Sequence, residues 1–115
     1  MKIITIGAWC AAAVLAGIAS QAWAQDKATQ ARSLAATCFT CHGNEGRSVG
    51  GVPPGLAGQD RDHLSQSLKD FKAGKRSATI MHQHAKGYTD EQIELIADYF
   101  SKVKAGPGAA APAAR

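Results

Sequence analysis

Apolar positions repeat at the spacing of an α-helix in three segments of this 115-residue chain. The first segment has its apolar residues three or four positions apart, at Ala28, Ala31, Leu34 and Ala35. The second repeats the pattern at Leu64, Leu68 and Phe71. The third has one apolar stripe, formed by Ile93, Ile96, Ala97, Phe100 and Val103. This period places the apolar side chains of each segment on one face, as in amphipathic helices that share a core.

Polar residues at the ends of these segments support the same interpretation. Asp60 is a suitable N-cap for the second helix, and Gly74 is a suitable stop. Thr89 and Gln92 have the spacing of a capping box at the start of the third helix. Residues 43–59 are rich in Gly and Pro, which is typical of a loop. Since no segment alternates as a strand does, we predict an all-α fold with three main helices and long loops.

The beginning of the chain has the features of an export signal. A positively charged start is followed by an apolar run over residues 3–24, which ends in Ala22-Trp23-Ala24, the small residues that signal peptidase requires. We therefore expect residues 1–24 to be a signal peptide and the mature protein to be periplasmic, without a membrane span. A retained membrane anchor is the alternative, because the apolar run is about long enough to cross a bilayer.

The mature chain would consist of one small domain and a tail. Residues 105–115 are rich in Ala, Pro and Gly and are expected to be flexible, which leaves residues 25–104 as the folded domain. The mature chain has 12 basic and 9 acidic residues, a balance that gives no reason to expect a nucleic-acid partner. Its apolar content predicts a modest core, and small domains of this kind usually need a metal, disulfides or a cofactor.

A five-residue motif indicates which cofactor this is. Residues 38–42 read Cys-Phe-Thr-Cys-His, and C-x-x-C-H is the signature of covalent haem attachment. Thiols three positions apart on a helical turn face the same way, so Cys38 and Cys41 can each add to one vinyl group of a haem. His42 can then bind the iron through an imidazole nitrogen. The motif occurs once, which predicts one covalently bound haem c per chain.

Three other interpretations of the two cysteines remain open at this point. A thioredoxin-like redox pair normally follows a strand, and we predict none before Cys38. A zinc site would need further ligands, for which the remaining histidines are His63, His82 and His84. A disulfide between Cys38 and Cys41 would close a very small loop and would stabilise little.

A haem iron bound by His42 has a sixth position to fill. Met81 is the only methionine of the mature chain, and it follows the second predicted helix within what we expect to be a loop. A thioether is a soft, neutral ligand that favours Fe(II), so ligation by Met81 would raise the reduction potential. Packing in the core is the alternative role for Met81. His82 and His84 are rival ligands in the same segment.

With these features the chain resembles class I cytochrome c over nearly the whole folded part. The segments CHGNEG, PPGLAGQ, LKDFKAGKR and IMHQHAKGYTDEQIELIADYF resemble the haem domains of dihaem cytochromes of the bacterial periplasm. They are still more similar to the cytochrome subunit of flavocytochrome c sulfide dehydrogenase. The resemblance implies that Cys38 and Cys41 form thioethers, with His42 as the proximal and Met81 as the distal iron ligand. It also implies that the Pro54 carbonyl accepts a hydrogen bond from the other ring nitrogen of His42.

The resemblance extends to the residues around the haem. It implies that Leu56 and Leu68 wall the haem pocket. It further implies that Tyr99 or Phe100 packs where the first and last helices cross.

A run of basic residues bears on the partners. Lys69, Lys72, Lys75 and Arg76 lie close together in the sequence, with Asp70 as the only acidic residue among them. They form either a solvated helix face or a docking patch for an acidic redox partner. We expect an electron-transfer protein rather than an enzyme, which carries single electrons between redox proteins. The alternative is a haem subunit bound to the flavoprotein of a sulfide dehydrogenase, in which the chain would take part in sulfide oxidation.

Overall fold

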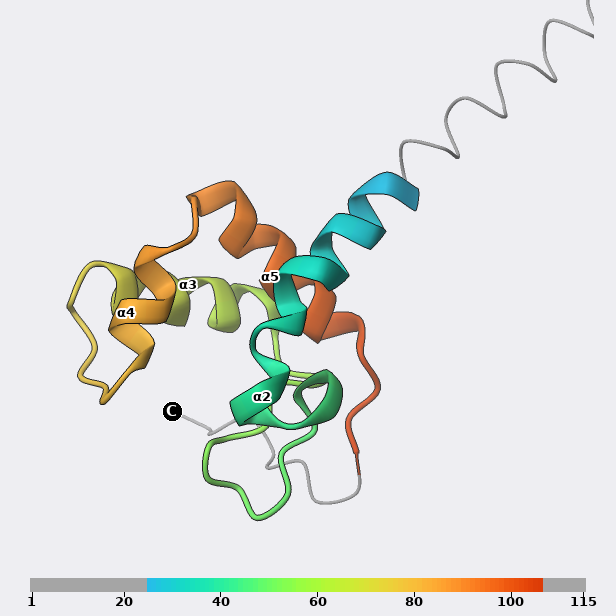
Figure 1. Cartoon of the computed structure of the whole chain (residues 1–115), viewed down its shortest axis with the longest axis horizontal. Coiled ribbons are helices and arrows are strands. Elements are labelled where there is room, and N and C mark those ends of the chain that lie inside the picture. Colours follow the sequence, from blue (N-terminus) through green and yellow to red (C-terminus); the bar gives the residue numbers. More distant parts are fainter. Residues whose placement is uncertain (1–24, 107–115) are drawn as a thin grey trace, which may run out of the picture.

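The computed structural model describes residues 25–106, which contain helices and loops and no strand. The predicted signal peptide and most of the predicted tail lie outside this range. Residues 25–36 are helical, and the elements that follow are α2 (Phe39–His42), the 3-10 helix η1 (Asn44–Gly46), α3 (Arg61–Lys72), α4 (Met81–Lys86) and α5 (Asp90–Lys102) (Figure 1). Within residues 25–106, no helix is both long enough and apolar enough to cross a bilayer.

The predicted N-caps are present at α3 and α5. The Asp60 side chain accepts a hydrogen bond from the backbone N–H of His63, at 2.8 Å, before α3 begins. Thr89 and Gln92 form the complete capping box before α5. These side chains satisfy backbone N–H groups that have no partner inside the helix, which fixes where each helix starts.

The short helix α4 was not predicted, because Met81 was expected to lie in a loop. Its sequence, Met-His-Gln-His-Ala-Lys, has no apolar stripe and is only six residues long. Ala85 is the residue that anchors it, since its side chain is fully buried. Packing against α3 therefore stabilises this helix, and such tertiary stabilisation does not leave a periodic pattern in the sequence.

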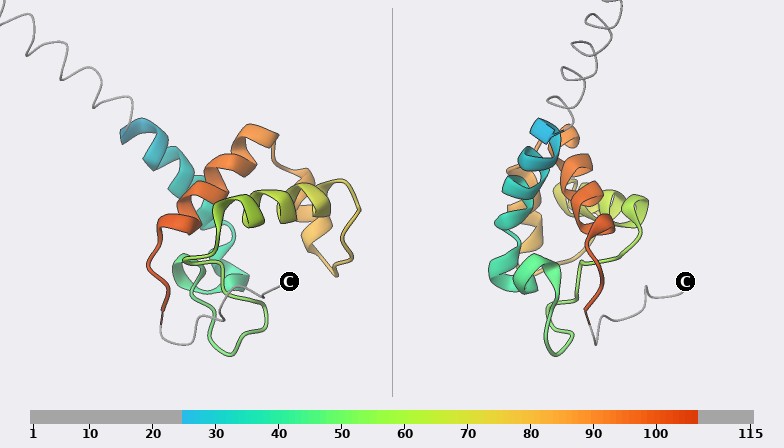
Figure 2. Two further views of the ribbon diagram at one scale, coloured as in Figure 1. Left: turned by 180° about the vertical axis from the view of Figure 1, so that it is seen from behind. Right: turned by 90° about the vertical axis from the view of Figure 1, so that its right-hand side faces the viewer.

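The core lies where α3, α5 and the helix over residues 25–36 meet. Figure 2 shows that this first helix and α5 lie side by side, and the same buried cluster contains residues of all three helices. Its members are Ala35, Leu64, Ile96, Ala97 and Phe100. The expectation that Phe100 packs where the first and last helices meet is therefore confirmed, and Tyr99 packs against the edge of the same cluster.

The loop after α2 is held close to this core by a glycine. Gly46 has a φ of +76°, and a Cβ at this position would lie 2.7 Å from a ring atom of Phe100. Only a residue without a side chain fits so close an approach and so readily adopts this left-handed conformation. Gly46 thus allows the loop that leaves the Cys-x-x-Cys-His turn to pack directly on α5.

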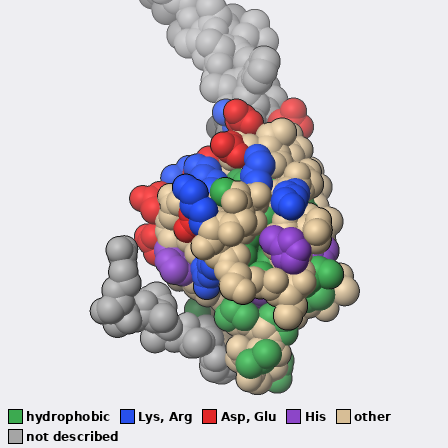
Figure 3. Space-filling view, turned by 90° about the vertical axis from the view of Figure 1, so that its left-hand side faces the viewer, with side chains coloured by type: hydrophobic (Ala, Val, Ile, Leu, Met, Phe, Trp, Pro, Cys, Tyr) green, Lys and Arg blue, Asp and Glu red, His purple; other side chains and the backbone are tan. Residues whose placement is uncertain are grey.

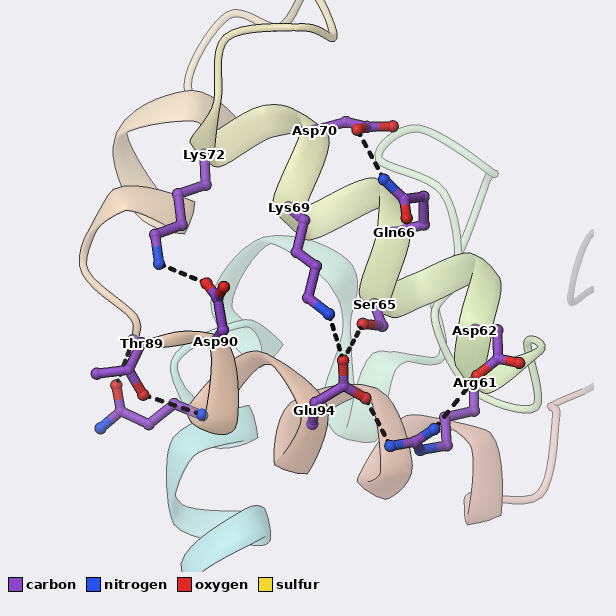
Figure 4. Close-up of polar contacts among 11 residues, drawn as sticks. Arg61, Asp62, Ser65, Gln66, Lys69, Asp70, Lys72, Thr89, Asp90 and Glu94 are labelled. Atoms are coloured by element: carbon purple, nitrogen blue, oxygen red, sulfur yellow. Dashed lines mark hydrogen bonds and ion pairs between the residues drawn. The ribbon is translucent and has the colours of Figure 1, made fainter.

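Ion pairs join α3 to α5 on the outside of the core (Figure 4). Glu94 of α5 accepts hydrogen bonds from Lys69 at 2.6 Å, from Ser65 at 2.5 Å and from Arg61 at 2.5 Å. Lys72 pairs with Asp90 in the same way, at 2.7 Å. Because the Lys69 ammonium and the Ser65 hydroxyl bind its carboxylate, the pKa of Glu94 lies below its usual value.

The Glu94 network predicts a loss of stability in acid. The folded protein holds the pKa of Glu94 below its ordinary 4.5, so the stabilisation is complete above pH 4.5 and is lost as the pH falls below it. We expect Glu94→Gln to lower the free energy of unfolding at pH 7 by about 1 kcal/mol, a small value because water reaches the carboxylate. In urea titrations, this difference from wild type should shrink as the pH falls below 4.5.

Asp62→Asn is the matched control. Asp62 is one turn from Ser65, and its side chain also contacts Arg61 but is 89% exposed. Its replacement should leave the pH dependence of stability unchanged. A deficit of Glu94→Gln that is as large at pH 3 as at pH 7 would show that the carboxylate charge does not hold α3 and α5 together.

Candidate haem site

The Cys-x-x-Cys-His motif folds as one tight helical turn that continues from the first helix. The backbone N–H of Cys38 bonds to the Ala35 carbonyl at 3.0 Å, after which Cys38 caps α2. The N–H groups of Cys41 and His42 both bond to the Cys38 carbonyl, at 3.3 and 2.9 Å. The three chemically active residues of the motif therefore come from a single turn of backbone.

His42 is the last residue of α2, and its orientation is fixed from outside the helix. Its side chain is only 7% exposed, and its Nδ1 lies 2.7 Å from the carbonyl oxygen of Pro54. A carbonyl can only accept, so Nδ1 carries the proton and Nε2 keeps a free lone pair. This contact is the one that the resemblance implied. The hydrogen bond sets the tautomer and the ring orientation, and so leaves Nε2 available to bind a metal.

The two cysteines have the state that haem attachment requires. Both are free thiols, with Cys38 partly buried and Cys41 exposed, so the structure does not contain the alternative disulfide. Burial raises the pKa of the Cys38 thiol, whereas a reactive thioredoxin-like cysteine has a lowered pKa. Within residues 25–106, no three His, Cys, Asp or Glu side chains gather as a metal-ion site would need, which gives the zinc interpretation no support.

Met81 is the first residue of α4 and is partly buried. The rival ligands differ in exposure, since His82 is also partly buried and His84 is exposed. All three side chains belong to the same short helix, so the fold brings them to one region without selecting one of them. The ligation of an iron by Met81 stays a prediction.

The apolar side chains that the resemblance placed around a haem are only partly covered by protein. Leu56 and Leu68 pack against the edge of the core cluster without becoming buried. Cys38 lies at the same edge. Partly exposed leucines beside a prepared histidine and two free thiols fit a large apolar group such as a porphyrin, which would complete their burial.

Two residues of the basic run form ion pairs within the protein, and its role as a docking patch stays a prediction. Lys69 and Lys72 lie in the ion pairs with α5, and their charges are balanced there. Arg76 lies over the ring of Phe71, 4.7 Å from its centroid. Within residues 25–106, Lys75 and Lys86 form no ion pair. These two lysines are therefore better placed than Lys69 or Lys72 to meet a partner's carboxylates.

Exposed apolar side chains occur in the loop that follows η1. Val49 is 96% exposed and Val52 is 88% exposed. Gly50 and Gly51 between them have open space around their Cα atoms. On the face shown in Figure 3, basic side chains gather in the upper part and apolar side chains lie along the lower edge. The molecule thus presents both a basic and an apolar region to its surroundings.

The sequence did not indicate one contact beside the motif. The Thr37 hydroxyl, next to Cys38, lies 2.6 Å from the Tyr88 hydroxyl. Neither residue belongs to a motif, and 51 positions separate them. The adjacency of Thr37 to Cys38 was the only available signal, and it does not identify Tyr88.

Comparisons with known proteins find a matching family and several similar proteins. A family model described as Cytochrome c matches residues 28–104. The cytochrome subunit of sulfide dehydrogenase from Chlorobaculum tepidum is 44% identical over 70 residues, which is 61% of this chain and 63% of that protein. A cytochrome c-554(548) from Halomonas halodenitrificans is 38% identical over 68 residues, or 56% of this chain and 82% of the relative.

A cytochrome c4 from Pseudomonas aeruginosa is 34% identical over 96 residues, which is 84% of this chain and 48% of that protein. The chain therefore spans less than two thirds of the sulfide dehydrogenase subunit and about half of the cytochrome c4.

Proposed function

The chain belongs to the cytochrome c family, and from this premise we propose that it holds one haem c and carries single electrons between redox proteins. When bound, the haem supplies an iron that alternates between Fe(III) and Fe(II). The observation that carries the proposal is the prepared His42, whose Nδ1–H is bound to the Pro54 carbonyl while two free thiols lie in the same turn.

Each residue of the site has a separate task in this proposal. Cys38 and Cys41 hold the haem covalently by adding their thiols to its vinyl groups. His42 binds the iron through Nε2, and the Pro54 carbonyl keeps the imidazole in that tautomer. Met81 would hold the iron with a neutral thioether, which would favour the reduced state.

The apolar side chains around the haem would affect the relative stability of the two iron states. Leu56 and Leu68 lie at the edge of the core, where they would exclude water from the haem. A site with little water favours the iron state of lower net charge, because separating charge from solvent is costly. The protein thus needs no acid, base or nucleophile of its own for electron transfer.

A spectroelectrochemical titration tests the proposal. We expect a reversible transition that fits a one-electron Nernst equation, with the same midpoint in the oxidative and reductive directions. A chain that takes up haem but shows no reversible one-electron couple would contradict the role of an electron carrier.

The alternative function is that of a haem subunit in a sulfide dehydrogenase complex. It is favoured by the similarity to the Chlorobaculum tepidum protein and by the exposed Val49 and Val52, which a permanent partner would cover. Purification from the native source discriminates the two functions. A free carrier elutes as a monomer, whereas a subunit copurifies with a yellow flavoprotein in a fixed ratio at high salt.

The location of the protein is part of the proposal. A periplasmic protein would be exported by residues 1–24 and cleaved after Ala24, leaving a domain over residues 25–104 and the tail over residues 105–115. The mass of the protein recovered from the periplasm tests this. A protein that retains residues 1–24 in a membrane fraction would instead be anchored.

A further inference from the structure

A single hydrogen bond links the haem-attachment turn to the segment that carries Met81. The Tyr88 hydroxyl lies 2.6 Å from Thr37 Oγ1, which also donates to the Leu34 carbonyl at 3.0 Å. A hydroxyl has one proton, and that of Thr37 is given to Leu34. Tyr88 is therefore the donor to Thr37, and the tyrosine reaches from the end of α4 to the residue before Cys38.

Among residues 25–106, this is the only side-chain hydrogen bond that joins residues 37–42 to residues 80–89. The other bonds of the attachment turn lead to Pro54, lead back to Ala35 of the first helix or stay within the turn, and none of them reaches residues 80–89. The fold holds α4 chiefly against α3, and Ala85 of α4 is fully buried. The distance between the two segments that supply the proposed axial ligands therefore depends on Tyr88.

The backbone around Tyr88 is well placed to transmit such a constraint. Its N–H bonds to the Ala85 carbonyl at 3.3 Å, so the residue is tied to the last turn of α4. The next residue, Thr89, is fixed by the capping box of α5. The ring packs against the edge of the core cluster and is half-buried. Movement of α4 away from the attachment turn would have to break the Tyr88–Thr37 bond.

We propose that Tyr88 is a positioning residue whose hydrogen bond to Thr37 keeps the Met81 segment next to the attachment turn and so keeps Met81 on the iron. This inference rests on the proposed function, since it takes Met81 as the distal ligand. A neutral thioether is a weak ligand, and small losses of positioning let a competing ligand replace it. His82 and His84 are nearby competitors within the chain.

The test measures the affinity of the oxidised holoprotein for added imidazole. Binding is monitored through the loss of the near-red absorption of the sulfur–iron bond. We expect Tyr88→Phe to raise the apparent binding constant about threefold, at the lower end of what one hydrogen bond contributes, because Thr37 is exposed. Thr37→Val should have the same effect. The double variant should have the imidazole affinity of Thr37→Val alone, since the Tyr88–Thr37 bond is already absent there; the bond from Thr37 to the Leu34 carbonyl, which Thr37→Val also removes, lies at the end of the first helical segment and does not reach α4. Thr37→Ser keeps a hydroxyl and should behave as wild type.

Tyr99→Phe is the matched control, because Tyr99 is the other tyrosine at the edge of the same cluster. It should leave imidazole affinity unchanged. Urea denaturation of each variant separates a positioning role from a general loss of stability. The proposal is supported if Tyr88→Phe binds imidazole about threefold more tightly than wild type while Tyr99→Phe does not. The two variants must have similar free energies of unfolding for this comparison.

Two results would overturn it, and they differ in what they reject. If Met81→Ala removes the near-red absorption while Tyr88→Phe binds imidazole as wild type does, Met81 is the ligand and the positioning role of Tyr88 is wrong. If the wild-type protein lacks that absorption, the ligation by Met81 is wrong and the inference fails with it.

Discussion

Met81→Ala is expected to lower the reduction potential by on the order of 0.2 V, within the ~0.8 V that axial ligands span in haem proteins. The thioether stabilises Fe(II) more than Fe(III), and its removal leaves a position that water or an added ligand takes. The oxidised variant should lose the near-red absorption of the sulfur–iron bond, and the reduced variant should bind carbon monoxide. Potentiometry and optical spectra measure both changes.

The neighbouring histidines provide the controls for this variant. His82→Ala and His84→Ala remove side chains from the same helix, α4, and should leave the near-red absorption in place. Met81→His should restore a six-coordinate iron at a lower potential than wild type, since imidazole favours Fe(III) more than a thioether does. An unchanged spectrum in Met81→Ala together with a changed spectrum in either histidine variant would assign the distal position to that histidine.

The double variant Cys38→Ser/Cys41→Ser is expected to lose both the covalent haem and the cooperative fold. The reason is the small size of the core in the described residues. Nine apolar residues are buried, and five of these are alanines. Leu64, Ile93, Ile96 and Phe100 are the larger ones, which is little apolar volume for a domain of this length. Burial of a haem against Leu56 and Leu68 would supply the missing apolar contacts.

Thermal unfolding followed by circular dichroism measures this effect. The double variant should show reduced helicity and a broad, non-cooperative transition, because a typical domain has only about 5–15 kcal/mol of stability to lose. Cys41→Ser alone keeps one thioether and should retain a cooperative transition at a lower temperature. A sharp, wild-type-like transition in the haem-free double variant would show that the helices fold without the cofactor.

Local sequence signals predicted most of the helical fold. Asp60, Thr89 and Gln92 act within one turn of their own helices, so their roles as caps could be inferred without tertiary structure. The same is true of the Cys-x-x-Cys-His turn. Helix α4 was missed because it is stabilised by packing against α3, and no local pattern in its own six residues identifies such a contact.

Contacts between distant parts of the chain could be predicted less well from the sequence. Lys69 and Lys72 lie 25 and 18 positions from their acidic partners, so no local pattern predicts that these charges are paired. Pro54 was expected beside His42 only through a family resemblance, because residues 43–59 have no periodic pattern from which a loop path could be derived. Tyr88 could not be predicted at all from the spacing of residues.

Intact mass spectrometry under denaturing conditions tests the central claim most directly, that Cys38 and Cys41 hold one haem covalently. The protein should be produced with a c-type maturation system, denatured in acid and measured beside the double serine variant. We predict that the wild-type chain is heavier than its polypeptide by one haem and that a proteolytic peptide containing residues 38–42 carries this increment. A wild-type protein that releases all of its haem in acid, with the mass of the polypeptide alone, would contradict the claim.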